Sequence, residues 1–325
     1  MPYLSQAERD YITEGVQSDL RADGRGRLDY RALVLETGII SQANGSARVR
    51  LGDGTDVLVG VKVEIDQVEP DADNVGKVVC NVEWYDILSF CFHYVHGYDS
   101  NYAKRTISSP SASQQFEGHG ADDLNNELTQ ALQRVLGGPQ CGINFEKLCI
   151  IKGQQCWIVY IDAMILDYSG NVLDTIFMAT KAALFNTRIP KTQIQDLGDG
   201  EFEFEVLDDV EDAERLDGIE NIPIGVTLNK IGTGHIIDAS PLEELCTEAK
   251  LTIAVNKDSQ ICGIQKGAEG GIEPGLMSEM IQTAKRIGQS LIQQLDQKLQ
   301  DEERQVDEKR LNGENIEKLG FFAMV

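Results

Sequence analysis

Positive charge is scarce in this chain. Lys and Arg together number 29 against 53 Asp and Glu, which gives a formal net charge of −24 and an isoelectric point of about 4.5. So acidic a protein repels the phosphate backbone of nucleic acids, which argues against tight autonomous binding through bulk charge. RNA contact through a local basic patch, or at a site that a basic partner completes, stays open.

Long apolar runs and paired cysteine motifs are also missing. No stretch approaches the ~18 consecutive apolar residues of a membrane-spanning helix, and Met1 to Asp10 has no apolar core typical of a signal peptide. The seven cysteines are scattered and include no Cys-x-x-Cys pair. This pattern is typical of reduced, buried thiols, so we expect a soluble intracellular protein without a disulfide framework.

The glycine-rich segment from Phe116 to Asp123 lacks the residues of a nucleotide-binding motif. It has neither Gly-Lys-Ser/Thr nor the third glycine of a dinucleotide fingerprint. A helix is predicted to follow it and to end at Gly137-Gly138-Pro139. Asp122 and Asp123 fall in the first turn of that helix, where they complement the helix dipole and repel an anion. Phosphate binding is therefore not expected here.

What the sequence does contain is a strand, turn and helix between Cys156 and Pro190. Trp157 to Leu166 is nearly unbroken apolar and β-branched, which predicts a strand covered on both faces. Gly170 suits a tight turn, Asn171 is placed to cap the following helix, and Pro190 ends that helix. We predict that this unit forms the centre of the core.

Asp162 is the one charged residue inside the predicted strand, and Asp167 follows it closely. A buried carboxylate must be paired or hydrogen-bonded, or it serves as a functional acid. Both aspartates are therefore candidates for metal or acid chemistry. The favoured interpretation is plainer, an aspartate at a strand end that accepts a hydrogen bond from a neighbouring backbone N–H.

Arginines gather in two N-terminal segments. The predicted turn from Asp19 to Arg27 includes Arg21 and Arg25, and the predicted strand at residues 45–51 places Arg48 and Arg50 on one face. Contact with an anion or a partner is one interpretation. Surface solvation or a structural salt bridge is at least as well supported for each of these residues.

The segment from Cys80 to Phe116 has no clean periodicity and is dense in aromatic residues from Tyr85 to Tyr102. Cys91, His93 and His96 could suggest a metal site, but no second pair of ligands lies nearby. An inserted loop is the better interpretation, and no metal or cofactor is predicted.

The remaining pattern predicts strands and a few helices in two similar halves, an α+β layout. A helix is expected at residues 5–20, and a long helix from Pro274 to Leu299, with the charged chain fraying from Asp296. The acidic stretch at residues 196–220 alternates like a half-exposed strand and separates the halves. Strands are expected at residues 33–40, 45–51, 55–64, 78–84, 148–151, 223–231, 234–238, 251–256 and 261–266.

Several motifs resemble the RNase PH-like subunits of the RNA exosome. They include Asp19-Leu20-Arg21-Ala22-Asp23-Gly24-Arg25, Gly45-Ser46-Ala47-Arg48-Val49, the strand at residues 57–64, Phe116-Glu117-Gly118 and the run from Lys181 to Pro190. The resemblance spans residues 5–295. It implies an RNase PH-like fold, two β-sheet and helix halves around a ribosomal protein S5 domain 2-like core. The expected parts are an N-terminal helix and arginine turn (1–30), domain 1 (31–195), domain 2 (196–295) and a charged tail (296–325).

Active members of that family perform phosphorolysis, in which inorganic phosphate attacks the last phosphodiester at the 3′ end of RNA. They carry arginines where this chain has Asp122 and Asp123, an aspartate where it has Ser169, and often another where it has Met164. Within the family, the chain resembles the ring subunit whose archaeal counterpart is non-catalytic. The resemblance therefore implies an inactive subunit in which Asp162 is structural.

The resemblance also implies the assembly and its location. Six RNase PH-like subunits form a ring around an RNA-threading pore, S1/KH subunits cap it, a separate exonuclease cuts the RNA, and no membrane is involved. The complex serves rRNA maturation and mRNA turnover in nucleus, nucleolus and cytoplasm. The candidates for RNA, pore or partner contact are Arg21, Arg25, Arg48, Arg50, Lys62 and Arg188.

Two alternative functions and one departure from the family's sequence pattern remain. The chain could be an active phosphorolytic exoribonuclease that uses Asp162 and Asp167 with a neighbour's arginines, or an α+β enzyme that acts on a small molecule. About two dozen residues, roughly 84–109, have no counterpart in most of the family. They are a lineage-specific loop or translated intron sequence, which sequencing the transcript would distinguish.

Overall fold

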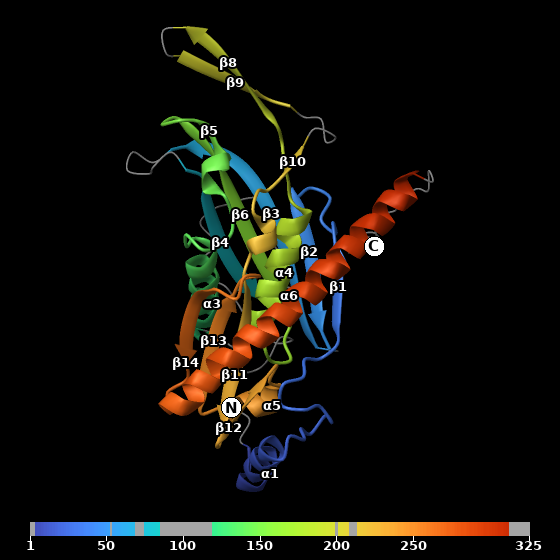
Figure 1. Ribbon diagram of the computed structural model, residues 1–325, viewed down its shortest axis with the longest axis vertical. Helices are drawn as coiled ribbons and strands as arrows, with labels where there is room; N and C mark the ends of the chain where they lie inside the picture. The colour runs from blue at the N-terminus through green and yellow to red at the C-terminus, as the bar shows by residue number, and fades with distance from the viewer. Residues whose placement is uncertain are drawn as a thin grey trace.

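The computed structural model describes residues 4–52, 54–68, 75–84, 119–198, 201–207 and 213–311. Figure 1 shows the two larger β-sheets, with helix α4 between them and the long helix α6 running diagonally across the molecule. The predicted α+β architecture of two sheet-and-helix halves is confirmed. In the described part of the chain, no helix is long and apolar enough to cross a bilayer.

The first half is built on a six-stranded sheet. Its strands follow the order β1 (Leu33–Thr37), β2 (Gly45–Leu51), β3 (Thr55–Gln67), β6 (Gln155–Asp167) and β4 (Lys77–Trp84), and β5 (Cys149–Ile151) also pairs with β6. Among the strand pairs that the structure describes, only β4 and β6 run parallel. A parallel pair needs a crossover, and α3 (His119–Leu136) lies in that connection and packs on β4.

Strand β6 departs from its predicted burial. Residues 156–159 are all buried, but from Tyr160 onward burial alternates, and Asp162 and Met164 are exposed. The expectation of a strand covered on both faces therefore holds only for its first part. The reason is that no described helix packs on the outer face of the sheet beside β3 and β4, so every second side chain meets solvent.

Helix α4 (Val172–Asn186) is the centre of the core, as predicted. Every residue from Val172 to Leu184 is buried, because β2 and β3 pack on one side of the helix and β11 on the other. The helix begins directly after Asn171, but this residue has φ = 57° and makes no capping bond with its side chain. The turn at Gly170 has φ = 82°, which confirms its predicted role.

The second half is a four-stranded antiparallel sheet covered by α6 (Pro274–Leu311). Its strand order is β12 (Gly234–Ile237), β11 (Ile224–Ile231), β13 (Ala249–Val255) and β14 (Ile261–Gly267), close to the predicted ranges. The short α5 (Pro241–Glu244) follows β12 and begins at a Ser240 capping box.

The prediction that the chain frays from Asp296 is wrong. Helix α6 continues to Leu311, and Leu299 is buried in the core of the first half. Lys298 Nζ donates to the carbonyl of Leu33 at 2.8 Å, and the backbone N–H of Thr37 donates to Glu302 at 2.9 Å. The acidic tail thus begins as a packed helix that is hydrogen-bonded to both ends of the edge strand β1.

Smaller elements complete the described chain. Helix α1 (Gln6–Gln17) starts at the predicted Ser5–Glu8 capping box. Strands β8 (Thr192–Gly198) and β9 (Glu201–Val206) form a hairpin that extends beyond the first sheet (Figure 1). The predicted strand is confirmed, but the alternation places Phe202 on the covered face, and this side chain is exposed. The remaining elements are β7 (Arg188–Ile189), β10 (Glu214–Arg215) and two 3₁₀ turns, η2 (Phe145–Leu148) and η3 (Ile219–Asn221).

Candidate functional site

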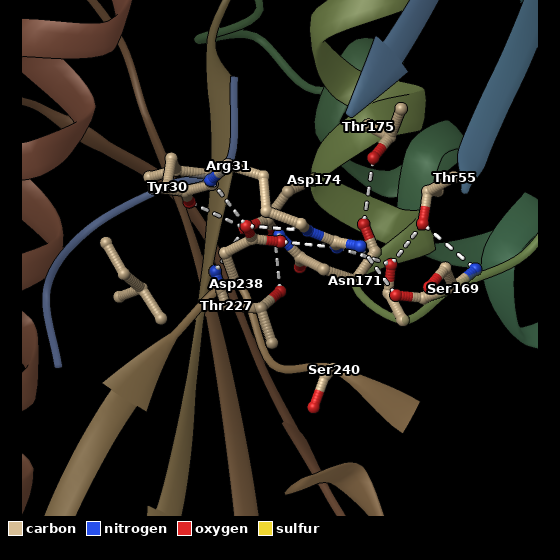
Figure 2. A network of polar contacts seen from close by, with 12 residues as sticks. Tyr30, Arg31, Thr55, Ser169, Asn171, Asp174, Thr175, Thr227, Asp238 and Ser240 are labelled. Atoms are coloured by element: carbon tan, nitrogen blue, oxygen red, sulfur yellow. Dashed lines mark hydrogen bonds and ion pairs between the residues drawn. The ribbon is translucent and has the colours of Figure 1, made fainter. Parts of the chain in front are cut away.

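A polar network joins the two halves, and its centre is Asp238, directly after β12. We call it the junction network. The carboxylate of Asp238 is fully buried, and it accepts hydrogen bonds from Arg31 Nη2 at 2.7 Å and from Arg25 Nη1 at 2.7 Å. Figure 2 shows its members converging from three parts of the chain. They are Tyr30, Arg31, Thr55, Ser169, Asn171, Asp174, Thr227 and Asp238.

Arg31 connects this carboxylate to the turn that follows β6. Its guanidinium donates to the carbonyl of Ser169 at 2.7 Å and to that of Gly170 at 3.1 Å. The hydroxyl of Thr55 donates to the Gly170 carbonyl at 2.7 Å and accepts from the Ser169 N–H at 3.1 Å. Ser169 therefore contributes its backbone to the network, and its turn is fixed from two sides.

Asn171 and Asp174 carry the network into helix α4. The Asn171 amide donates to Asp238 Oδ1 at 3.2 Å. Asp174, fully buried, accepts from the Tyr30 hydroxyl at 2.7 Å and from the Thr227 hydroxyl at 2.6 Å. Burial raises the pKa of Asp174, although the hydrogen bonds from Thr227 and Tyr30 oppose that shift.

Arg21 is a structural residue, which contradicts its predicted contact with RNA, the pore or a partner. Its side chain has no exposed surface. The guanidinium forms a two-pronged ion pair with Glu243 and also donates to the carbonyls of Ile237 at 3.0 Å and Asp238 at 2.8 Å. A buried arginine engaged in this way stabilises the junction and cannot reach a phosphate.

Two further acids of the second half lie beside the turn at residues 169–171. Glu243 accepts from the Ser240 N–H at 2.8 Å in addition to Arg21. Glu244 accepts from the Asn171 N–H at 3.0 Å and from the Tyr168 hydroxyl. Three carboxylates, those of Asp238, Glu243 and Glu244, therefore lie near the turn at Ser169, and they are the residues that sequence reasoning missed.

A sequence signal for these acids did exist. The segment Ile237-Asp238-Ala239-Ser240-Pro241 ends a strand on an aspartate and starts a capped helix that carries Glu243 and Glu244. Carboxylates at such a strand-to-helix turn often belong to sites. Chemically, however, each of these acids already accepts hydrogen bonds from an arginine, a hydroxyl or a backbone N–H of this chain. The arrangement is suited to locking the two halves together.

Asp162 lies elsewhere, on the outer face of the first sheet. It stands opposite Gly60 on β3 and Asn81 on β4, and it lines a cavity of about 390 Å³. The walls of this cavity desolvate the carboxylate and, together with Glu83, raise the pKa of Asp162, while Asn81 and Lys62 oppose the shift. Met164 and Lys62 line the same cavity, and Lys62 forms an exposed ion pair with Glu64.

Asp167 is the last residue of β6 and lies beside a charged cluster formed by Asp56, Arg48 and Arg50. It stands opposite Asp56, which pairs with Arg48 at 2.6 Å and with Arg50 at 3.3 Å. The two arginines therefore share a face, as predicted. Asp167 follows Asp162 by five steps along the extended strand, a distance of roughly 16 Å at ~3.3 Å per step. The two candidate acids are not brought together.

The other predicted residues are dispersed. Arg25 pairs with Asp23 and Asp238 and is 14% exposed, whereas Arg188 pairs with Glu303 and is 33% exposed. Asp122 and Asp123 lie near the start of α3, and Asp123 is exposed.

Cys91, His93 and His96 lie outside the described residues, as does the segment 85–118 that holds most of the predicted insertion. In the part of the chain that the structure describes, no cluster of three His, Cys, Asp or Glu side chains could hold a metal ion.

Comparisons with known proteins agree with this architecture. A protein named exosome complex exonuclease RRP42, from Dictyostelium discoideum, is 36% identical over 348 aligned residues, covering 93% of this chain and 99% of the relative. The exosome complex component Rrp42 of Pyrococcus abyssi is 35% identical over 264 residues, covering 81% of this chain and 84% of the relative.

Solved structures give the same result. A chain of an archaeal exosome core superposes with a TM-score of 0.66 at 25% identity, covering 89% of this chain and 96% of the other. A chain of the Archaeoglobus fulgidus exosome with RNA bound to the active site gives a TM-score of 0.69 at 27% identity, covering 89% and 97%. The predicted RNase PH-like fold is confirmed. Models of domains 1 and 2 of the 3′ exoribonuclease (RNase PH) family match residues 29–190 and 221–287, and the chain belongs to this family.

Proposed function

We propose that this chain is a non-catalytic ring subunit of an RNA exosome. It supports 3′-to-5′ RNA processing and degradation, including rRNA maturation and mRNA turnover, by holding the ring together and by threading RNA. Its partners are the other RNase PH-like subunits of a six-member ring, the S1/KH cap subunits, a separate exonuclease and RNA. The relatives named as exosome components and the exosome core structures support this assembly. We place it in nucleus, nucleolus and cytoplasm.

The observation that supports the non-catalytic role is that the carboxylate of Asp238 is buried and already paired. Phosphorolysis needs cationic donors that are free to hold phosphate and a carboxylate free to exchange a proton. The carboxylate of Asp238 is fully buried and engages the guanidinium groups of both Arg25 and Arg31. The cations and the acid at the junction neutralise one another, which favours a structural role.

The rival function, an active exoribonuclease that uses Asp162 and Asp167, has less support from the geometry. Two acids that act on one scissile bond must lie within a few ångströms of the reacting atoms. Here they are separated by roughly 16 Å of extended strand. Asp167 also lies beside Asp56, whose carboxylate pairs with Arg48 and Arg50.

Co-expression tests the assembly directly. The full chain would be produced with the other five RNase PH-like subunits of its own organism and examined by native mass spectrometry. We expect one copy of this chain in each six-membered ring. A chain that stays monomeric in the presence of all five partners would contradict the proposal.

A further inference from the structure

Two arginines converge on a single carboxylate where α6 crosses the end of α4. Arg188 Nη2 lies 3.1 Å from Glu303 Oε1, and Arg215 Nη2 donates to the same oxygen atom. The two arginines stand directly opposite each other on the paired strands β7 and β10. Like charges in that position repel unless an anion lies between them. Glu303 is that anion.

Each guanidinium is also held by groups other than Glu303. Arg188 Nη1 donates to the carbonyls of Phe185, Asn186 and Thr187 at 3.2 to 3.4 Å, at the negative end of the α4 dipole. The guanidinium carbon of Arg215 lies 5.4 Å from the centre of the Phe185 ring, within cation–π range. The pair is therefore pre-organised, and we expect it to stay converged when Glu303 moves away.

The site is reachable from solvent. The side chains of Arg188, Arg215 and Glu303 are 33%, 45% and 28% exposed. A planar guanidinium fork binds carboxylate and phosphate oxygens in similar geometry. Glu303 lies in the last third of α6, beyond Leu299, the last residue of that helix whose side chain is described as buried.

We propose that Arg188 and Arg215 form a binding site for an RNA backbone phosphate, and that Glu303 occupies this site as an internal competitor. The proposal rests on the RNA-threading role given above. It adds to that role a defined cationic contact for RNA, which Glu303 blocks until it moves away. Phosphate binding requires the terminal part of α6 to withdraw Glu303. RNA and the helix end then compete for the same two guanidinium groups, so the acidic chain holds RNA only where this helix end is displaced.

The test compares two variants that change charge equally on the same helix. Glu303→Gln removes the competing carboxylate, whereas Glu308→Gln removes an exposed carboxylate of α6 away from the pair. Binding of a fluorescein-labelled 20-nucleotide oligo(U) RNA to the full-length chain would be measured by fluorescence anisotropy at several KCl concentrations. We expect Glu303→Gln to bind about fivefold more tightly than Glu308→Gln, with a plot of log K against log salt steeper by about 0.7.

A second substitution tests whether the higher RNA affinity of Glu303→Gln comes from the arginine pair. Arg215→Gln added to Glu303→Gln is expected to bring the affinity back to that of Glu308→Gln, and thermal melting confirms that each variant is folded. Equal affinity of Glu303→Gln and Glu308→Gln, including no binding by either, would overturn the proposal. So would a gain that survives Arg215→Gln. Ring assembly, measured in parallel by native mass spectrometry, separates this outcome from failure of the ring-subunit proposal.

Discussion

The ammonium group of Lys181 lies 3.3 Å from Asp296 Oδ1, which ties the central helix α4 to α6. Lys181 is 2% exposed, and its other two contacts are the carbonyls of Glu220 and Ile222 at 3.4 and 3.3 Å. Burial lowers the pKa of Lys181, and the charge of Asp296 opposes that shift. Among the described residues, Asp296 is therefore the carboxylate whose contact keeps this buried lysine charged.

Asp296→Asn should lower the free energy of unfolding by about 1–3 kcal/mol, because a buried ammonium group loses its counter-charge. Equilibrium urea denaturation at pH 7.5 measures the change. The control is Asp301→Asn, which removes an exposed partner of Arg304 on the same helix and should cost less than about 0.5 kcal/mol. Equal effects of the two substitutions would show that the buried pair contributes nothing specific.

His235 should make the protein less stable as the pH falls through the histidine range. The side chain is 2% exposed, and neither ring nitrogen has a hydrogen-bond partner among the described residues. Burial and the nearby Arg27 lower the pKa of His235, while Glu279 at 3.9 Å opposes the shift. The unfolded chain therefore takes up a proton before the folded chain does. Stability falls from about pH 6.5 down to the lowered pKa in the folded state.

The measurement is urea denaturation at pH 7.5 and 5.5 for the wild type and for His235→Leu. Both proteins contain every other titrating group, so the difference between their pH responses isolates His235. We expect the wild type to lose more stability than the variant between these two pH values. An identical pH response of the two proteins would show that His235 keeps its ordinary pKa in the fold.

Gly170→Ala should strongly destabilise the junction between the halves. Gly170 has φ = 82°, and an added Cβ would lie 2.2 Å from the carbonyl oxygen of Ala239. We expect a loss of roughly 2–4 kcal/mol, seen as a lower midpoint in thermal denaturation. Gly271→Ala, where the Cβ would meet nothing within 4 Å, is the matched control and should change the midpoint little.

Leu299→Ala should show that α6 is packed beyond Asp296. Leu299 is 1% exposed and belongs to the core of the first half, so its truncation should remove about 2–4 kcal/mol of stability. Met277→Ala, on an exposed part of the same helix, should have a much smaller effect. If Leu299→Ala were as mild as Met277→Ala, the end of the helix would not be docked on the first half.

The regular elements could be predicted because their determinants are local. The apolar spacing of α4, the alternation of β9 and the Gly170 turn are each set by neighbouring residues. Local pattern could not show which side of β6 would be covered. Asp162 interrupts an apolar run that predicts burial, yet it faces an open cavity on the outer face of the sheet, where no described helix packs.

The site could not be predicted in the same way because its pairs are distant in sequence. Arg21 and Glu243 are 222 residues apart, so nothing near Arg21 distinguishes a structural guanidinium from an RNA contact. The continuation of α6 was missed for the same reason. The charged residues after Asp296 look solvated until Lys181, Leu33 and Thr37 are brought against them by the fold.

The central claim is that this chain supports RNA degradation without catalysing it. The most direct test is phosphate-dependent shortening of a 5′-labelled RNA by the reconstituted ring, containing either the wild-type chain or the variants Asp162→Ala, Asp167→Ala and Glu244→Gln. We predict that each variant ring shows the same rate as the wild-type ring, whatever that rate is. Phosphate-dependent shortening that disappears in any one of these folded variants would contradict the claim and make this subunit a catalyst.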